Sequence, residues 1–326
     1  MIILTPNRQK QDIFEQKHAK IAKAMAVSTP QPQNYSGIQT KRYILACATT
    51  ALLGFGCKPA PVLLPPSSSD TPRVISLAPS ITEIVYALGG TNQLIGRSSA
   101  CDYPPAAVSN VPVIGDFGIP SLERMVSLRP DQVLYTDLAD PMMDNKMKRV
   151  GLHPVHIACD RLADIPPAII HVGQLIRHAS EAQVLASNVV EQIQLARQQA
   201  KAFTHRPRVL VLIWHDPFYA AGNKSFVSDL ITLAGGQNIG DEINRDYFQA
   251  SSEWVLAHDP DIVFCFFMVS STSVSQTIMK QPGWSHMKAV QNGRVYDGFD
   301  NNIALRPGPR VMQGLEVIKK QIQGME

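Results

Sequence analysis

Two stretches of the chain open with short apolar runs that are rich in branched residues. The first run covers residues 74–77 and the second covers 209–213, and charged residues and turn formers bound both. This pattern is typical of β-strands that are buried on both faces. Similar runs predict further strands at 94–96, 133–135 and 262–266.

Helical spacing follows each opening run. After the first run, Ser80 is expected to cap a helix that ends at Gly89. After the second, Ser225 or Ser228 is expected to cap a helix that ends at Gly235. These residue types are the ones preferred at helix starts and stops. The alternation of strands and helices predicts an α/β fold.

The two stretches also share one pattern at a constant offset of 130 residues. The members that coincide without a gap are Ser121, Glu123, Pro130, Asp131 and Val133 in the first stretch, and Ser251, Glu253, Pro260, Asp261 and Val263 in the second. A single repeat of such a long period does not fit a solenoid. It indicates two lobes of related structure.

A long amphipathic helix is predicted between the two stretches. Apolar residues recur there every three or four positions, at Leu185, Val189, Ile193, Ala196, Ala200 and Phe203. Ser180 opens a capping-box pattern, and a helix from Glu181 to Phe203 would be ~35 Å long. Pro207 follows its expected end.

These patterns together predict an α/β fold of two lobes, each with a mainly parallel central sheet flanked by helices, joined by a single long backbone helix. The N-terminal lobe is placed at 73–177, the connecting helix at 178–205 and the C-terminal lobe at 206–326. The cleft between two such lobes is the expected ligand site.

Residues 1–57 are predicted to be an N-terminal extension and an export signal. Lys41 and Arg42 precede an apolar run that is shorter than a membrane span and ends in Gly56 and Cys57. This end resembles a bacterial lipobox, so Cys57 is the expected lipid anchor, with plain cleavage or an uncleaved anchor as alternatives. Residues 58–72 are rich in Pro and Ser and predict a flexible tether. The protein is therefore expected in the periplasm or at the cell surface as a membrane-tethered lipoprotein.

Composition and charge exclude several classes of protein. A length of 326 residues and a hydrophobic content of 45% suit two ordinary domains and exclude a disordered chain. From Lys58 onward there are 23 basic and 25 acidic residues, so the body gives no electrostatic case for nucleic-acid binding. Beyond the signal only Cys101, Cys159 and Cys265 remain, which predicts free thiols or at most one disulfide.

The chain resembles the helical-backbone, metal-chelate-binding class of ABC-importer substrate-binding proteins over about residues 73–320. The strings that carry the resemblance are Arg73-Val-Ile-Ser-Leu-Ala-Pro-Ser-Ile-Thr-Glu83, Cys101-Asp-Tyr-Pro-Pro105, Pro120-Ser-Leu-Glu123, Leu128-Arg-Pro-Asp131, Gln281-Pro-Gly-Trp284, Asn292-Gly-Arg-Val-Tyr296 and Arg306-Pro-Gly-Pro-Arg310. Within the class, the chain is most similar to the cobalamin-binding branch. The resemblance implies a monomeric receptor without intrinsic cofactor, which hands a corrinoid to a permease dimer and its ATPase subunits.

The resemblance also assigns roles to single residues. Glu123 and Glu253 match the glutamates that pair with arginines of the permease subunits in this family. On sequence alone, both could simply favour the start of a helix, where a carboxylate suits the helix dipole. Charge reversal of both residues to Lys is expected to abolish uptake while leaving ligand affinity intact.

The expected ligand-binding residues are Asp116 or Phe117, with Phe218, Tyr247 and Arg306. A corrinoid is a large, partly apolar disc that carries amides, so its site needs aromatic faces and a few polar groups. The chain departs from the cobalamin branch at Ala100 and Thr136, where relatives carry aromatic residues. Asp300 and Asn302 are ambiguous, and Arg310 is expected to be structural.

Other ligands and an enzymatic role remain as alternatives. Haem-binding relatives supply an axial Tyr in the loop that here reads Asp116-Phe117, and siderophore binders need cationic pockets, for which Arg97, Arg161 and Arg306 are unassigned candidates. His153 and His156 lie three residues apart on a predicted strand, which is poor spacing for a metal site. The motifs GxSxG, GxxxxGK[ST], GxGxxG and HExxH are absent from the sequence, so no catalytic residues are assigned, although His215-Asp216 could form half of an acid/base pair.

Overall fold

The computed structural model describes residues 71–267 and 274–324. They belong to a compact unit, Pro65–Glu326, and the remaining unit, Met1–Leu64, lies outside the described residues. The predictions for Cys57, the export signal and nearly all of the tether therefore concern residues outside the described part. None of the helices within the described ranges is both long and apolar enough to cross a membrane.

The first sheet has six strands in the order β4-β3-β2-β1-β5-β6. All neighbours are parallel except β3 and β4, which form an antiparallel hairpin. The strands are β1 (Val74–Ser76), β2 (Leu94–Ser98), β3 (Val113–Asp116), β4 (Ile119–Pro120), β5 (Gln132–Tyr135) and β6 (Pro154–His156). The helices of this lobe are α2 (Pro79–Ala87), α3 (Pro105–Val108), α4 (Leu122–Leu128), α5 (Met143–Arg149) and α6 (Ile165–Leu175).

The second sheet is more mixed. Its order is β10-β8-β7-β11-β12, with β9 also paired to β7. Strands β9, β11 and β12 run parallel to β7, whereas β8 is antiparallel to both β7 and β10. The strands are β7 (Arg208–His215), β8 (Phe218–Ala221), β9 (Gln237–Asn238), β10 (Tyr247–Gln249), β11 (Ile262–Cys265) and β12 (Val295–Tyr296). The helices are α8 (Phe226–Leu233), α9 (Ser252–His258), α10 (Val274–Met279), α11 (Lys288–Gln291), α12 (Asn301–Ala304) and α13 (Val311–Gln323).

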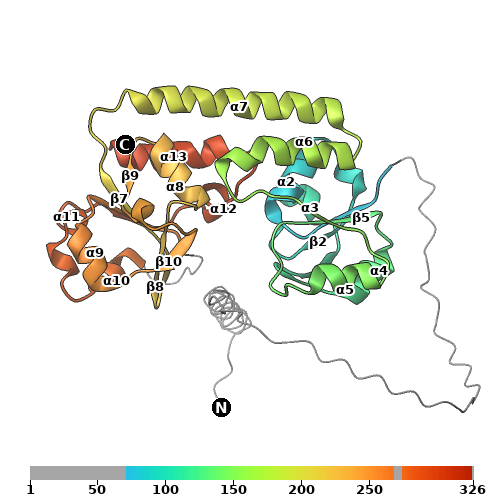
Figure 1. The fold of residues 1–326 in the computed structure, drawn as a ribbon, viewed down its shortest axis with the longest axis horizontal. Coiled ribbons are helices and arrows are strands. Elements are labelled where there is room, and N and C mark those ends of the chain that lie inside the picture. The colour runs from blue at the N-terminus through green and yellow to red at the C-terminus, as the bar shows by residue number, and fades with distance from the viewer. Residues whose placement is uncertain (1–70, 268–273, 325–326) are drawn as a thin grey trace, which may run out of the picture. The chain divides into compact units, whose positions relative to one another are not determined.

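The long helix α7 (Ala179–Lys201) follows the first sheet and precedes the second, as the fold prediction required (Figure 1). It packs closely along α6, because Gly173 of α6 lets the two backbones approach: a Cβ at this position would overlap the Cβ of Ala182. One cluster of buried hydrophobic residues includes Val74 of β1, helices α6 and α7, and Phe264 of β11. A single core thus joins both sheets through α7.

Two predicted helix starts are wrong. Helix α2 begins at Pro79, which is pre-organised for the first helical position, so Ser80 lies inside the helix and does not cap it. Helix α7 begins at Ala179, directly after a left-handed turn at Arg177, and Ser180 therefore forms no capping box. Ser225, in contrast, caps α8 by accepting a hydrogen bond from the Ser228 amide, as predicted.

Candidate functional site

The repeated pattern performs the same structural task in both lobes. Ser121 caps α4 by accepting the amide of Arg124, and Ser251 caps α9 by accepting the amide of Trp254. The strand residues of the pattern, Val133 and Val263, are both fully buried.

The aspartates of the pattern accept backbone hydrogen bonds at the starts of β1 and β7. The Asp131 carboxylate accepts the Arg73 amide at 2.8 Å, just before β1. The Asp261 carboxylate accepts the Arg208 amide at 2.7 Å, at the start of β7. Each aspartate thus satisfies a backbone donor that would otherwise need another acceptor.

The glutamates of the pattern are exposed. Glu123 and Glu253 both occupy the second position of their helices, and neither forms an ion pair among those found in the described residues. Hydrogen bonds from its own amide and from the Ser251 hydroxyl hold the pKa of Glu253 below its usual range. Both side chains are therefore exposed to solvent, and neither is ion-paired with the opposite lobe within the described residues.

The loops that follow the carboxyl ends of parallel strands are called here the carboxyl edge of each sheet. In open α/β sheets this edge is where ligands bind. Asp116 and Phe117 lie at the carboxyl edge of the first sheet, at the tip of the β3–β4 hairpin. Asp116 accepts a hydrogen bond from the Ser99 hydroxyl at 3.0 Å, and the Phe117 side chain is 38% exposed. Phe117 is thus a free aromatic face at the predicted position.

Aromatic residues of the second sheet differ in exposure. Phe218 is only 9% exposed and stacks on the fully buried Trp284 at 4.9 Å, so packing already accounts for it. At the carboxyl end of β7, His215 is exposed, stacks on Trp214, and meets the ring of Phe267 edge-on. The sequence signal for this group was the Trp-His pair at the end of a predicted strand.

Tyr247 lies at the start of β10 and is half-buried against the shared core. Burial, with the charges of Asp246 and Asp160, raises its pKa to about 12. Asp160 follows β6 of the first sheet, and its own pKa is raised by burial and by Asp137, among other carboxylates. Tyr247 packs against the hydrophobic cluster to which both lobes contribute.

The Arg306 guanidinium donates hydrogen bonds to four residues of the protein. Its Nη1 donates to Asp102 at 2.6 Å and to Glu83 at 3.3 Å, and its Nη2 donates to Asn302 at 2.6 Å and to the Ala100 carbonyl at 3.2 Å. Asp102 and Ala100 follow β2, whereas Arg306 and Asn302 follow β12, so the carboxyl edges of the two sheets meet here.

Two further arginines join the lobes. Arg310 donates two hydrogen bonds to Glu83, from Nη2 at 2.6 Å and from Nε at 2.9 Å, and its guanidinium lies 3.7 Å from the centre of the Tyr103 ring. Arg161, after β6, forms a bidentate pair with Asp229 of α8 at 2.6 and 2.9 Å. Arg310 is therefore structural, as expected.

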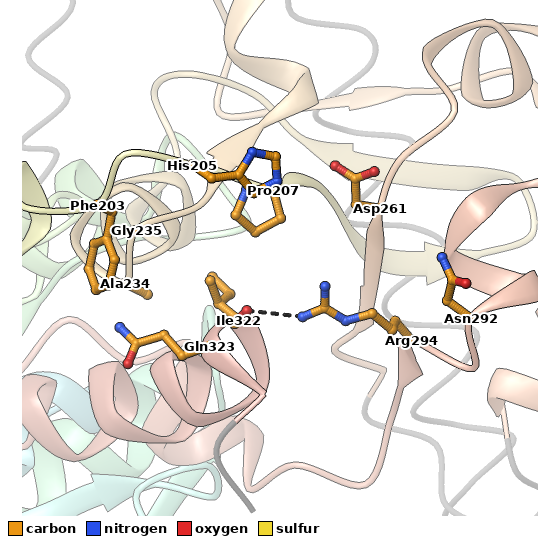
Figure 2. A pocket seen from close by; sticks show the side chains of 10 residues that line it. All are labelled: Phe203, His205, Pro207, Ala234, Gly235, Asp261, Asn292, Arg294, Ile322 and Gln323. Carbon is orange, nitrogen blue, oxygen red and sulfur yellow. Dashed lines mark hydrogen bonds between the residues drawn. The ribbon is translucent and has the colours of Figure 1, made fainter.

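Two cavities in the described part of the chain lie elsewhere. One of about 520 Å³ is lined by Phe203, His205, Asp261, Arg294 and Gln323, among others, where the chain leaves α7 and where α13 ends (Figure 2). The other, of about 410 Å³, lies between α6 and α7. Neither contains a predicted ligand-binding residue, so the carboxyl edges remain the candidate ligand site.

The remaining chemistry-bearing residues are dispersed. Cys101, Cys159 and Cys265 are free and buried, and burial raises the pKa of Cys159 to about 12. Within residues 71–267 and 274–324, no three His, Cys, Asp or Glu side chains are grouped as metal ligands would be. His153 directly precedes the short strand β6 and His156 is its last residue, and the His156 ring packs edge-on against Tyr135.

Known proteins share this sequence and fold. Residues 74–301 match the model of the family described as periplasmic binding protein. A vitamin B12-binding protein of Pectobacterium atrosepticum is 32% identical over 255 residues, which cover 77% of this chain and 88% of the relative. The uncharacterized ABC transporter substrate-binding lipoprotein YvrC of Bacillus subtilis is 26% identical over 258 residues, which cover 77% of this chain and 79% of the relative. The solved periplasmic heme-binding protein RhuT of Roseiflexus sp. RS-1, in apo form, has a TM-score of 0.70 at 28% identity and covers 78% of this chain and 98% of its own.

Unfolding measurements test which residues of the repeated pattern stabilise the fold. Asp131→Ala or Asp261→Ala should lower the free energy of unfolding in urea by about 1 to 3 kcal/mol, because a strand amide loses its acceptor. Glu123→Ala and Glu253→Ala should leave that free energy almost unchanged, because both side chains face solvent. A glutamate variant as destabilised as its aspartate counterpart would show that the glutamates serve folding.

Proposed function

Because this chain belongs to the periplasmic binding protein family, we propose that it captures a corrinoid between its two carboxyl edges and delivers it to an ABC transporter. The chain is an extracytoplasmic ABC transporter substrate-binding protein of the class that carries vitamin B12, haem or siderophores. Its family and structural neighbours are transport-related binding proteins and not enzymes, and the bound molecule is cargo, not a resident cofactor. The corrinoid is the proposed member of that ligand set.

The pairing of the candidate arginines carries this proposal. Arg306 is bound by two carboxylates, Arg161 by Asp229, and Arg97 donates to the carbonyls of Val108, Ser98 and Cys101. An anionic ferric siderophore would have to break these bonds to obtain a cation, and a partly buried carboxylate left behind would be costly. A corrinoid needs no such cation, because its rim carries uncharged amides that bind to short polar groups.

Haem is the second candidate, since RhuT, a heme-binding protein, shares this fold. The resemblance places an axial tyrosine of haem binders in the loop that here contains Asp116 and Phe117. The exposed Phe117 ring offers a stacking face but no metal ligand. The 32% identity to a vitamin B12-binding protein agrees with a corrinoid.

We assign the contact with the transporter to Glu123 and Glu253. One exposed carboxylate per lobe, at the same position of equivalent helices, suits a permease made of two subunits. Exposed charges of this kind set orientation and association rate more than affinity. Cys57 is the proposed lipid anchor, which agrees with the lipoprotein named in Bacillus subtilis, and the receptor is proposed to act as a monomer.

Isothermal titration with cobinamide, cyanocobalamin, haemin and a ferric siderophore tests the ligand. The wild-type protein should bind a corrinoid one-to-one with a submicromolar dissociation constant. Phe117→Ala should weaken that binding about threefold to tenfold, through loss of a stacking face. Leu195→Ala, which removes an exposed apolar side chain from α7, should have no effect. Tight binding of the siderophore without any corrinoid binding would contradict the proposed ligand.

Uptake by cells tests the docking residues. The double variant Glu123→Lys with Glu253→Lys should abolish corrinoid uptake, because both charges that face the permease are reversed, while the titrated affinity stays at the wild-type value. The matched control is Glu191→Lys with Glu316→Lys, which reverses two exposed charges on α7 and α13. Wild-type uptake by the first variant would rule out the docking role.

A further inference from the structure

Glu83 is a buried carboxylate of the first lobe that pairs with more than one arginine of the second. It lies on α2, and its side chain is 3% exposed. Three hydrogen bonds reach it from the other lobe, two from Arg310 and one from Arg306. A buried charge persists only when it is paired and hydrogen-bonded in this way.

The charges of this cluster balance. The two guanidinium groups of Arg306 and Arg310 face two carboxylates, Glu83 and Asp102. Glu83 contacts both arginines, whereas Asp102 contacts Arg306 alone. The net charge of the four side chains is therefore zero.

The cluster also reaches the candidate ligand site. The side chains of Arg306 and Arg310 are 14% and 13% exposed, and Asp102 is half-exposed. Asn302, which bonds both Arg306 and Asp102, lies in the same segment as Asn301, and the Asn301 amide donates to the carbonyl of Phe267. The cluster therefore lies where the two carboxyl edges meet, and both guanidiniums keep a small exposed surface.

We propose that Glu83 is a specificity-determining residue, which neutralises Arg306 and Arg310 so that the site accepts chelates without net negative charge and refuses anionic ones. This inference rests on the proposed function and deepens it. Glu83 is a positioning residue that acts through the arginines. Its carboxylate accepts hydrogen bonds from Arg306 and Arg310, and these N–H donors therefore stay bonded to the protein. Without its charge, the cluster would carry one uncompensated positive charge at the edge of the site, which an anionic ligand could pair with.

The experiment titrates the purified full-length chain with cobinamide and with haemin, whose two propionates make it anionic. Glu83→Gln should raise haemin affinity about tenfold, with a gain that shrinks as salt is added, and should weaken cobinamide binding far less. Asp102→Asn, at a half-exposed position, should produce a similar gain in haemin affinity. Asp140→Asn, which removes an exposed ion pair within the first lobe, is the matched control and should change neither affinity.

A charge-restoring variant separates this role from a purely structural one. Glu83→Gln combined with Arg310→Gln returns the cluster to zero net charge, and haemin affinity should fall back to the wild-type value. The thermal midpoint of each variant reports whether it is folded. Equal weakening of both ligands by Glu83→Gln, an unchanged haemin affinity in both Glu83→Gln and Asp102→Asn, or no reversion in the double variant would overturn the inference.

The wild-type titration distinguishes this inference from the proposed function. If the wild-type chain binds no corrinoid, the proposed function fails. If it binds a corrinoid and the variants show no gain for haemin, only the role of Glu83 fails. Tight binding of haemin by the wild-type chain at low salt would contradict both.

Discussion

A buried carboxylate of the first lobe, paired with two arginines of the second, is one of the interactions that hold the two lobes together. Glu83 belongs to the first lobe, but both of its cationic partners, Arg306 and Arg310, belong to the last part of the chain. Removing one partner of such a buried pair costs about 3 to 5 kcal/mol, because the other charge stays behind without compensation. The Arg161–Asp229 pair and the shared core against α7 also join the two lobes. With the Glu83 contacts, they hold the loops of the candidate ligand site next to each other. Binding should therefore proceed with little rotation of one lobe against the other.

The internal repeat shows how function is separated from folding. Its serines cap helices, its aspartates hold the first strand of each sheet and its valines are buried, so each of these residues has a structural task. The glutamates lie exposed in the first turns of α4 and α9, where a carboxylate favours the helix dipole, and they recur at the same position. A repeated exposed charge is a candidate for contact with a partner, and a symmetric pair suits a partner that is itself made of two subunits.

Local patterns predicted β1, β2, β5, β7 and β11, the two lobes and α7, because the spacing of apolar residues within each element reflects its burial. They could not show which distant residues surround the predicted ligand contacts. Arg306 is hydrogen-bonded to Glu83, Asp102 and Asn302, and the first two lie more than 200 residues away in sequence. The ring of Phe218 packs on Trp284, which no short-range pattern connects to it. The predicted start of α7 was wrong because Arg177, two residues before the helix, has a left-handed backbone conformation. The sequence pattern did not predict that turn.

The most direct test of this account is a crystal structure of the protein with cobinamide bound. The account predicts that the corrinoid lies between the two carboxyl edges, with Phe117 against its face, while Arg306 and Arg310 keep their hydrogen bonds to Glu83. A structure in which these arginines leave Glu83 to bind the ligand would contradict the central claim that the lobes and the charge balance of the site depend on this one carboxylate.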